Sequence, residues 1–371
     1  MALTKYVLGE LLDRNTEYND QLKFGTENVR GVLNTKGISD TRVSVDTRDL
    51  SKFLVVRPGG FIFNHRVHDK LGLGYNTSND VYIFTNDYVA FYVKPEMAKN
   101  VLLPDYLYIW YLRPEFDRYM LFKTYGSATL FFNWDNMCEL EIELPDITIQ
   151  RKFVAIYKAM VANQQSYERG LEDLKLVCDG YIEDLRRKMQ CAPIGDFIGQ
   201  SKEKNSDGLI TLEQGINIEK KFITPQRSND NFYGRQIVRT GQIAYCTQLN
   251  NANIAVALRT GPDCIVSSVY DVIFIKDQTK LLPEYLMIWL SRREFGRFVY
   301  WASQGTSYEF LSYENLAGYK IPVPDIHVQE AIASIYNCYI RRREINEQLK
   351  AQVKDICPIL IKGSLEESAK A

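Results

Sequence analysis

Nine residues, Leu102-Leu103-Pro104-Asp105-Tyr106-Leu107-Tyr108-Ile109-Trp110, recur as Leu281-Leu282-Pro283-Glu284-Tyr285-Leu286-Met287-Ile288-Trp289. The displacement of 179 residues then holds without a gap from residue 102 to residue 157. Across those 56 positions the two copies share 21 identical residues, far more than chance supplies. Self-similarity over this length indicates a duplicated structural unit.

Within residues 102–157 the identities continue beyond the first nine positions. Later matches are a glycine (Gly126 and Gly305), a phenylalanine (Phe131 and Phe310) and a Pro-Asp-Ile-x-x-Gln element (145–150 and 324–329). Upstream of residue 102 the likeness is weaker and needs small gaps. A shared frame with divergent early parts suggests one binding task performed twice on different targets, and simple drift of a duplicated structural domain is the alternative.

The chain of 371 residues is too long for one ordinary core, and the order of elements predicts an α+β fold. Runs rich in β-branched and aromatic residues, broken by Gly, Asn and Pro, predict strands at 61–63, 81–84, 89–93, 265–266 and 272–275. A long helix follows the strands in each copy. We expect a first domain at 1–146, a central helix at 147–190, a second domain at 191–325 and a C-terminal helix at 326–371.

Both long helices carry apolar residues in alternating steps of three and four, which is typical of a heptad seam. Two such helices bury their seams most simply against each other as an antiparallel coiled coil. The expected architecture is therefore two domains related by a pseudo-twofold axis and separated by this pair, with an ordinary helix bundle as the alternative. Asn163 and Arg342 occupy the same place in the two series, where they predict a polar interruption of the seam.

Composition and charge exclude several classes of protein. Forty-five Lys and Arg against 46 Asp and Glu give a net charge of −1, so any nucleic-acid binding must come from local patches. No stretch is apolar enough for a membrane span and the first residues do not form a signal peptide, so we expect a cytoplasmic protein without membrane contact. The seven cysteines are scattered without a Cys-x-x-Cys pair, which predicts reduced thiols.

Sequence motifs for catalysis are missing. The chain has three histidines, and the pair His65-x-x-His68 lacks a third ligand at a familiar spacing, so no metal site is expected. There is no phosphate loop, dinucleotide fingerprint or nucleophile elbow. The Asn/Asp-Pro-Pro-Tyr element of amino-methyltransferases is also missing, as is a nuclease arrangement. These observations predict a chain that is not an enzyme and needs no cofactor.

Polar loops between the strands offer amides, hydroxyls and cations that can read base edges, although turn formation in solvent explains many such residues equally well. A second shared feature is a glycine turn, 123–127 and 302–308, that could hold phosphate. Basic clusters at 186–188, 220–221, 292–293 and 341–343 are typical of solvated surfaces. The candidate DNA-binding residues are Asn64, His65, Arg66, His68, Lys70, Tyr75, Asn76, Lys123, Ser127, Thr247, Gln248, Asn250, Asn251, Asn253, Gln304, Thr306 and Ser307.

The doubled order of these elements resembles the specificity (S) subunits of Type I restriction-modification systems. The resemblance lies in the Leu-Pro-Asp/Glu-Tyr-Leu, Gly-Ser/Thr and Pro-Asp-Ile-x-x-Gln elements, each set followed by a long heptad helix, and it covers essentially the whole chain. It implies two target-recognition domains, each reading one half of a bipartite sequence in double-stranded DNA.

The resemblance also implies partners that perform the chemistry. These are two methylation subunits, which bind S-adenosylmethionine and methylate adenine, and restriction subunits, which bind ATP to translocate and cut DNA. The expected role in phage defence is thus to direct these enzymes to a target. A non-catalytic, two-lobed scaffold that holds proteins instead of DNA is the alternative.

Overall fold

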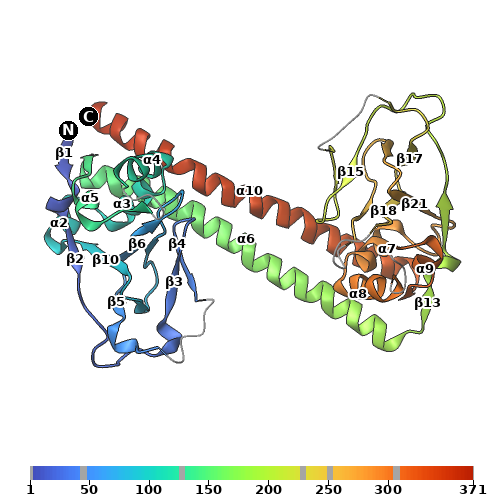
Figure 1. Ribbon diagram of the computed structural model, residues 1–371, viewed down its shortest axis with the longest axis horizontal. Helices are drawn as coiled ribbons and strands as arrows, with labels where there is room; N and C mark the ends of the chain where they lie inside the picture. The colour runs from blue at the N-terminus through green and yellow to red at the C-terminus, as the bar shows by residue number, and fades with distance from the viewer. Residues whose placement is uncertain are drawn as a thin grey trace. The chain divides into compact units, whose positions relative to one another are not determined.

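The computed structural model describes residues 3–41, 48–124, 130–225, 231–248, 254–303 and 310–370. Its contacts divide the α+β chain into two compact units (Figure 1). Unit 1 comprises Met1–Ser166 with Asn346–Ala371, and unit 2 comprises Tyr167–Ile345. Each unit therefore contains one end of each long helix.

Unit 1 is built on an antiparallel sheet in the order β2-β10-β6-β8, flanked by the two-stranded ladders β1-β12, β3-β4, β5-β9 and β7-β11. The strands are β1 (Thr4–Val7), β2 (Leu12–Asn15), β3 (Arg30–Leu33), β4 (Gly37–Asp40), β5 (Leu54–Val56), β6 (Phe61–Asn64), β7 (Arg66–Val67), β8 (Leu73–Tyr75), β9 (Tyr82–Phe84), β10 (Tyr88–Val93), β11 (Leu130–Phe131) and β12 (Glu141–Leu144). The helices are α1 (Leu8–Leu11), α2 (Pro95–Asn100), α3 (Pro104–Tyr111), α4 (Pro114–Lys123), α5 (Trp134–Cys138) and the first half of α6 (Ile147–Lys188).

Unit 2 repeats this topology, with a sheet in the order β14-β21-β18-β19 and the ladders β13-β22, β15-β16 and β17-β20. Its strands are β13 (Cys191–Pro193), β14 (Ile198–Ser201), β15 (Gly215–Ile216), β16 (Phe222–Ile223), β17 (Gln236–Val238), β18 (Ile243–Cys246), β19 (Val256–Leu258), β20 (Cys264–Val266), β21 (Tyr270–Ile275) and β22 (Lys320–Pro322). Its helices are α7 (Pro283–Leu290), α8 (Arg293–Ala302), α9 (Tyr313–Ala317) and the first half of α10 (Ile326–Lys370). The predicted strands are confirmed to within two residues at each end, and the repeat extends through the early part of each unit.

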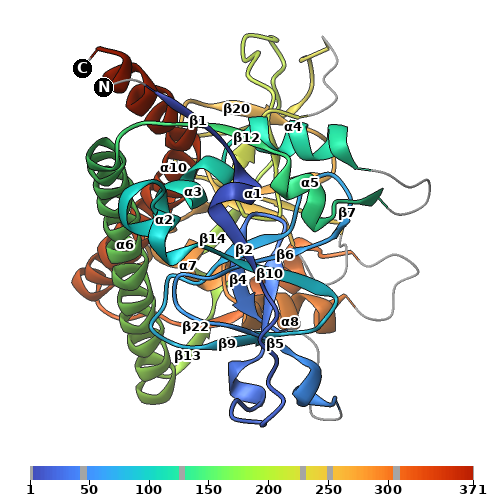
Figure 2. The ribbon, with the colours of Figure 1, turned by 90° about the vertical axis from the view of Figure 1, so that its left-hand side faces the viewer.

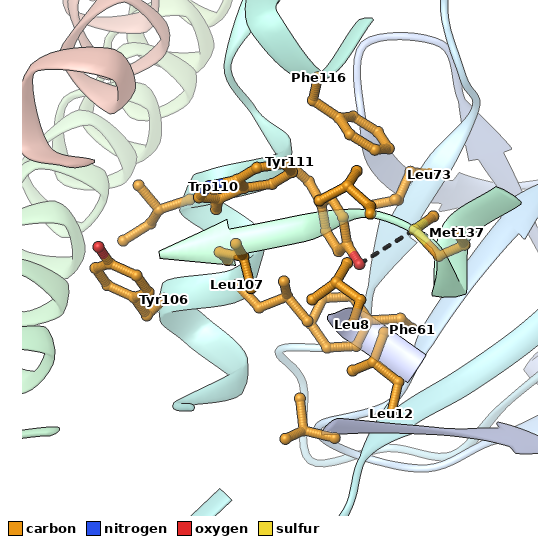
Figure 3. Close-up of a cluster of buried hydrophobic side chains, with 14 of the residues drawn as sticks. Leu8, Leu12, Phe61, Leu73, Tyr106, Leu107, Trp110, Tyr111, Phe116 and Met137 are labelled. Carbon is orange, nitrogen blue, oxygen red and sulfur yellow. Dashed lines mark hydrogen bonds between the residues drawn. The ribbon is translucent and has the colours of Figure 1, made fainter. Parts of the chain in front are cut away.

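The largest core of unit 1 forms between the sheet and α3 (Figure 3). Phe61 of β6 stacks against Tyr75 and Phe91, with ring centroids 4.5 and 5.0 Å apart. Tyr111 is fully buried at the end of α3, and its hydroxyl donates to the Met137 sulfur at 3.3 Å. The Leu-Pro-Asp-Tyr-Leu element thus supplies the helix that covers the sheet, with Pro104 at the first helical position, where a missing N–H costs nothing.

A buried glutamine ties the start of each long helix to the start of the helix that covers the sheet. In unit 1 the Gln150 carbonyl oxygen accepts from Leu103 N–H at 3.0 Å, and its amide donates to the carbonyls of Val101 and Pro145. Gln329 makes the corresponding three bonds in unit 2, to Leu282, Lys280 and Pro324. Both side chains have no exposed surface, which explains why the two sequence elements recur together.

The two long helices pack antiparallel within each unit. In unit 1, Lys152 pairs with Glu367 at 2.7 Å, while the Gln164 amide donates to Asn346 at 3.1 Å. In unit 2, Ile182 and Ile332 share the core of the domain. Each domain core is thereby continuous with one end of the helix pair.

The predicted polar interruption of the seam is wrong at Asn163, whose side chain is exposed. Arg342 is also largely exposed, but its guanidinium lies 6.0 Å from the centroid of the Tyr167 ring on the other long helix. The buried stripe of α6 passes through Gln150, Val154, Tyr157, Val161 and Gln164, which is a heptad series displaced by one residue from the predicted one. The buried polar contact in unit 1 is instead Gln164 with Asn346, which is 2% exposed.

A lysine anchors the β3-β4 hairpin of unit 1 and its counterpart β15-β16 in unit 2. Lys36 donates to the carbonyl of Tyr111 at 2.7 Å, and Lys220 donates to the carbonyl of Leu290 at 2.6 Å. Both lysines have left-handed φ angles, 64° and 63°, which glycine adopts more readily. Their side chains reach the last residue of α3 or α7, where each amino group donates to a carbonyl that has no partner within the helix.

The two lysines differ in their charge partners. Asp117 lies 2.7 Å from the Lys36 amino group and opposes the fall in pKa that burial causes there. The residue at the repeat-equivalent position in unit 2 is Gly296, and burial lowers the pKa of Lys220 to about 8. Charging Lys220 therefore destabilises unit 2.

Replacing Gln150 by Ala should destabilise unit 1, because it strands the N–H of Leu103 and two carbonyls in the core. Each such group costs about 1 to 3 kcal/mol when it is left unpaired. Hydrogen-exchange mass spectrometry should show faster exchange across 101–123, while peptides from 191–325 keep their rates. Gln165, an exposed glutamine on the same helix, provides the control, and Gln165→Ala should leave the exchange rates of both sets of peptides unchanged. Unchanged exchange in the Gln150 variant would contradict this role.

The Lys220 contact predicts a pH dependence of stability. Because its pKa is about 8 in the folded chain and 10.5 in the unfolded chain, the unfolded state binds more protons between these values. The free energy of unfolding should therefore rise with pH from about 8 to 10.5, by about 3 kcal/mol at most. Urea unfolding of wild type and Lys220→Met across this range measures the difference. Lys221→Met, a neighbour whose amino group pairs at the surface with Glu344, should retain the wild-type slope.

Candidate nucleic-acid interface

In unit 1 the loop after β6 is joined to the segment that follows the glycine turn. The Asn64 side chain accepts from the Arg66 N–H at 3.0 Å, which turns the chain so that β7 pairs with β11. Phe132 N–H donates to the carbonyl of His65 at 2.9 Å. The His65 ring stacks on Phe131 with centroids 5.6 Å apart and planes 18° from parallel. The loop after β6 and the segment that begins at β11 thus form one surface.

This surface presents a short cationic run. The side chains of Arg66, His68 and Lys70 are exposed, and the guanidinium of Arg66 lies 3.9 Å from the carboxylate of Asp87. An exposed ion pair at that distance contributes little free energy. The guanidinium can therefore leave Asp87 and bind a ligand at a small cost in free energy. We refer to His65, Arg66, His68 and Lys70 as surface 1. Its donors suit guanine edges and phosphates.

Three other predicted residues of unit 1 lie away from this surface. Asn76 is 1% exposed, and its amide donates to the carbonyls of Val56 and Asp80 while its oxygen accepts from Ser78. That side chain is saturated within the fold and is not available to a base. Tyr75 packs in the core against Phe61, and burial raises the pKa of its hydroxyl.

Lys123 ends α4 with its amino group directed at Glu139, 3.0 Å away. The hydrogen bond to that carboxylate, and then its charge, raise the pKa of Lys123, so the residue stays a cation. Its side chain points toward the end of α5 instead of toward surface 1. The predicted Ser127 lies outside the described residues.

Unit 2 repeats the junction with different side chains. Gln248 pairs with Phe310 in an isolated bridge, and Leu311 N–H donates to the Thr247 carbonyl at 2.8 Å. Thr247 itself is 6% exposed, and its hydroxyl donates to the Val269 carbonyl at 3.0 Å, so it holds the loop in place. Gln248 is exposed. We refer to Gln248 and Phe310 as surface 2.

The rest of the predicted set for unit 2 cannot be placed. These residues fall outside the ranges that the structure describes: Asn250, Asn251, Asn253, Gln304, Thr306 and Ser307. They flank the Gln248–Phe310 bridge in the sequence, on the loop after β18 and on the glycine turn.

The repeated arginines near α4 and α8 support the framework. The Arg113 guanidinium lies 4.4 Å from the centroid of the Trp110 ring, and burial lowers its pKa. The Arg292 guanidinium lies 5.8 Å from the centroid of the Trp289 ring, and it forms an ion pair with the carboxylate of Glu183 on α6 at 2.6 Å. The basic pair 292–293 is therefore only partly a solvated cluster.

Sequence reasoning missed two exposed aromatic residues in the last turns of α4 and α8, Phe122 and Trp301. They are repeat-equivalent, since they differ by 179 positions. The sequence did contain a signal for them. An aromatic residue occupies the same position in both copies, and that position does not fall on the helix face that packs against the core.

The described part of the chain contains neither a candidate metal site nor a candidate membrane-spanning helix. There, no three His, Cys, Asp or Glu side chains gather to hold a metal ion. No described helix is both long and apolar enough to cross a membrane.

Comparisons with known proteins agree with this architecture. Residues 194–355 match the family model described as "Type I restriction modification DNA specificity domain". The fold aligns with a Type-I restriction-modification system S subunit from M. genitalium with a TM-score of 0.58 at 11% identity, over 99% of this chain and 96% of that one. A comparison with curated proteins finds no match.

Two further solved structures align over nearly the whole chain with lower scores. The HsdS subunit from Thermoanaerobacter tengcongensis is 14% identical over 98% of this chain and 96% of its own, with a TM-score of 0.40. A chain from a structure titled for "complex assembly" and "conformational transition of the type I R-M system" is 12% identical over 98% of each chain, with a TM-score of 0.45.

The duplicated α+β frame, with one loop surface on each copy, defines a two-unit binding protein. The family match within the second copy and the fold of the whole chain then narrow the class. Residues 194–355 match the DNA specificity domain of Type I restriction-modification systems, and the whole chain shares the fold of the S subunit from M. genitalium.

The different environments of Asn76 and Arg66 predict different effects of substitution. Asn76→Ala should lower the thermal stability of unit 1, because it leaves buried backbone groups unpaired at about 1 to 3 kcal/mol each. Arg66→Ala should stay within about 0.5 kcal/mol of wild type, since the side chain is exposed. Circular dichroism melts of the two variants test this. Equal loss of stability in both would contradict the assignment of Asn76 to the framework.

Proposed function

We propose that the chain reads a bipartite sequence in double-stranded DNA, one half with each unit. In this proposal residues 1–146 and 191–325 are the target-recognition domains, and residues 147–190 and 326–371 are the spacer helices. The observation that carries it is the repeat of the loop junction, as a two-residue ladder in unit 1 and a single bridge in unit 2, with different exposed side chains. One frame thus presents a cationic run in unit 1 and an amide in unit 2, which suit different base edges.

Surface 1 supplies direct readout through Arg66, with His68 and Lys70 available for phosphates. Arginine binds the O6 and N7 acceptors of guanine in a bidentate manner, and glutamine does the same with N6 and N7 of adenine. Gln248 is the described residue of surface 2 that fits this second role. The predicted amides and hydroxyls at 250–253 and 304–307 lie outside the described residues, and we propose that they contribute to the same half-site.

The partners follow from the net charge of −1 and from the family. A nearly neutral chain gains little from counterion release, so tight binding needs further cations around the DNA. We infer that two methylation subunits, which bind S-adenosylmethionine, supply these contacts and the methyl transfer. Restriction subunits that bind ATP join the same complex. The chain carries no catalytic step, binds no cofactor of its own, and works in the cytoplasm, where the DNA is.

A scaffold for proteins is the competing function, and single substitutions in the assembled complex separate the two. Arg66→Ala should relax the methylated motif at one position of one half-site, with a loss of about 1 to 3 kcal/mol of discrimination. Gln248→Ala should do so in the other half-site only. Sequencing the methylated sites of host DNA gives both motifs.

Matched controls for this experiment are Arg187→Ala and Gln190→Ala, which remove exposed side chains of the same types near the end of α6. Both should leave the motif unchanged. A scaffold function predicts that the motif stays the same in all four variants. Simultaneous change in both half-sites would show that the surfaces are assigned wrongly.

A further inference from the structure

Each unit exposes one large aromatic side chain at the same place. Phe122 is 83% exposed in the last turn of α4, and Trp301 is 70% exposed in the last turn of α8. A single exposed apolar residue needs no explanation. Here the same position is aromatic and exposed in both copies although the residue type has changed, so drift alone explains it poorly.

The local structure directs these side chains outward. The core-facing positions of α4 are Phe116 and Met120, both fully buried, so Phe122 lies on another face of the helix. The same division holds in α8, where Phe295 and Val299 are buried. Trp301 touches Phe298 with ring centroids 6.2 Å apart and still keeps most of its surface in solvent.

An exposed arginine stands one helical turn before each aromatic residue. Arg118 precedes Phe122 by four positions, and Arg297 precedes Trp301 by four. Residues at this spacing lie on the same face of a helix. Each arginine is held by a weak surface pair, to Glu115 at 3.2 Å and to Glu294 at 3.7 Å. Such pairs exchange easily for another anion.

The ends of α4 and α8 are close in sequence to the recognition surfaces. Only residues 124–129 separate α4 from β11, which pairs with β7 of surface 1. Figure 2 shows the end of α4 and the β7 strand on the side of unit 1 that faces away from α6. In unit 2 the chain runs from Trp301 to Phe310, which pairs with Gln248. The aromatic residue and the reading loop are thus joined through one short segment in each copy.

We propose that Phe122 and Trp301 each stack on a base at a distorted step beside the half-site that their own unit reads. Arg118 and Arg297 bind the flanking phosphates. This inference rests on the proposed function and adds to it a contact that is independent of base identity, because every base has a face on which an aromatic ring can stack. On each helix face the arginine can bind a phosphate while the aromatic ring stacks on the neighbouring base. An apolar pocket on a partner subunit would have no use for the arginine, so this pairing favours DNA as the ligand.

The test uses the chain assembled with its methylation subunits. Target duplexes carry 2-aminopurine at successive positions within and beside each half-site, and fluorescence reports the stacking of that base. Phe122→Ala should abolish the signal change at the half-site that Arg66→Ala alters, and Trp301→Ala should do so at the other. Each should weaken binding to the target by about 5- to 150-fold, the range expected for one lost stacking contact.

Conservative and control variants keep the result specific. Phe122→Trp and Trp301→Phe should retain the fluorescence signal and the affinity. Leu22→Ala and Leu209→Ala remove exposed apolar side chains, 61% and 79% exposed, that have no aromatic counterpart in the other copy, and they should behave as wild type. Native mass spectrometry of every variant measures subunit stoichiometry.

The outcomes separate the possibilities. Loss of the fluorescence change with normal stoichiometry supports base stacking. Loss of a methylation subunit from the Phe122→Ala or Trp301→Ala complex assigns these residues to a partner pocket and overturns the inference. Wild-type fluorescence and affinity in both alanine variants also overturn it, while leaving the proposed function intact. A wild-type complex that does not distinguish target from non-target duplex overturns the proposed function itself.

Discussion

Each unit depends on three hydrogen bonds made by one buried glutamine. The side chains of Gln150 and Gln329 sit where the end of the last strand, the start of a long helix and the start of the sheet-covering helix meet. At this meeting point backbone groups have no regular partners, because both helices begin there. One amide side chain provides both a donor and an acceptor, so it satisfies groups of both kinds. It thus fixes the start of the long helix against the domain, while Val154 in unit 1 and Ile332 in unit 2 add apolar contacts between the long helix and the domain core.

The repeat made the fold largely predictable, because identical residues in one register mark the positions that packing and hydrogen bonding constrain most. The strand runs and both long helices follow from pattern alone. The polar break in the helix seam was predicted one residue too early on α6, because two neighbouring heptad series both contain apolar residues and the count alone does not choose between them. Asn163 therefore faces solvent while Gln164 faces Asn346.

The candidate site was less predictable, for a different physical reason. A polar residue in a loop has the same chemistry whether it reads a base or closes a turn, and only its hydrogen-bond partners distinguish the two roles. Asn76 and Thr247 prove to be framework residues because backbone groups occupy their side chains. Phe122 was missed for the opposite reason, since an aromatic residue in a helix predicts core packing unless the helix face is known.

The contacts that the two units share explain how one frame tolerates so much change in sequence. Shared contacts join a side chain to the backbone, as with the two lysines of the hairpins and the helix caps Asn133 and Ser312. A backbone carbonyl or N–H is present whatever residue occupies that position, so such a contact requires only one residue to be kept. Contacts between two side chains require both partners. The surface pair of Arg118 with Glu115 recurs as Arg297 with Glu294, but others differ between the copies. Tyr106 bonds to Ser364, whereas its repeat equivalent Tyr285 bonds to a backbone carbonyl. Because the frame needs few fixed residues, the loops it carries are free to diverge, which is what a protein that reads two different half-sites requires.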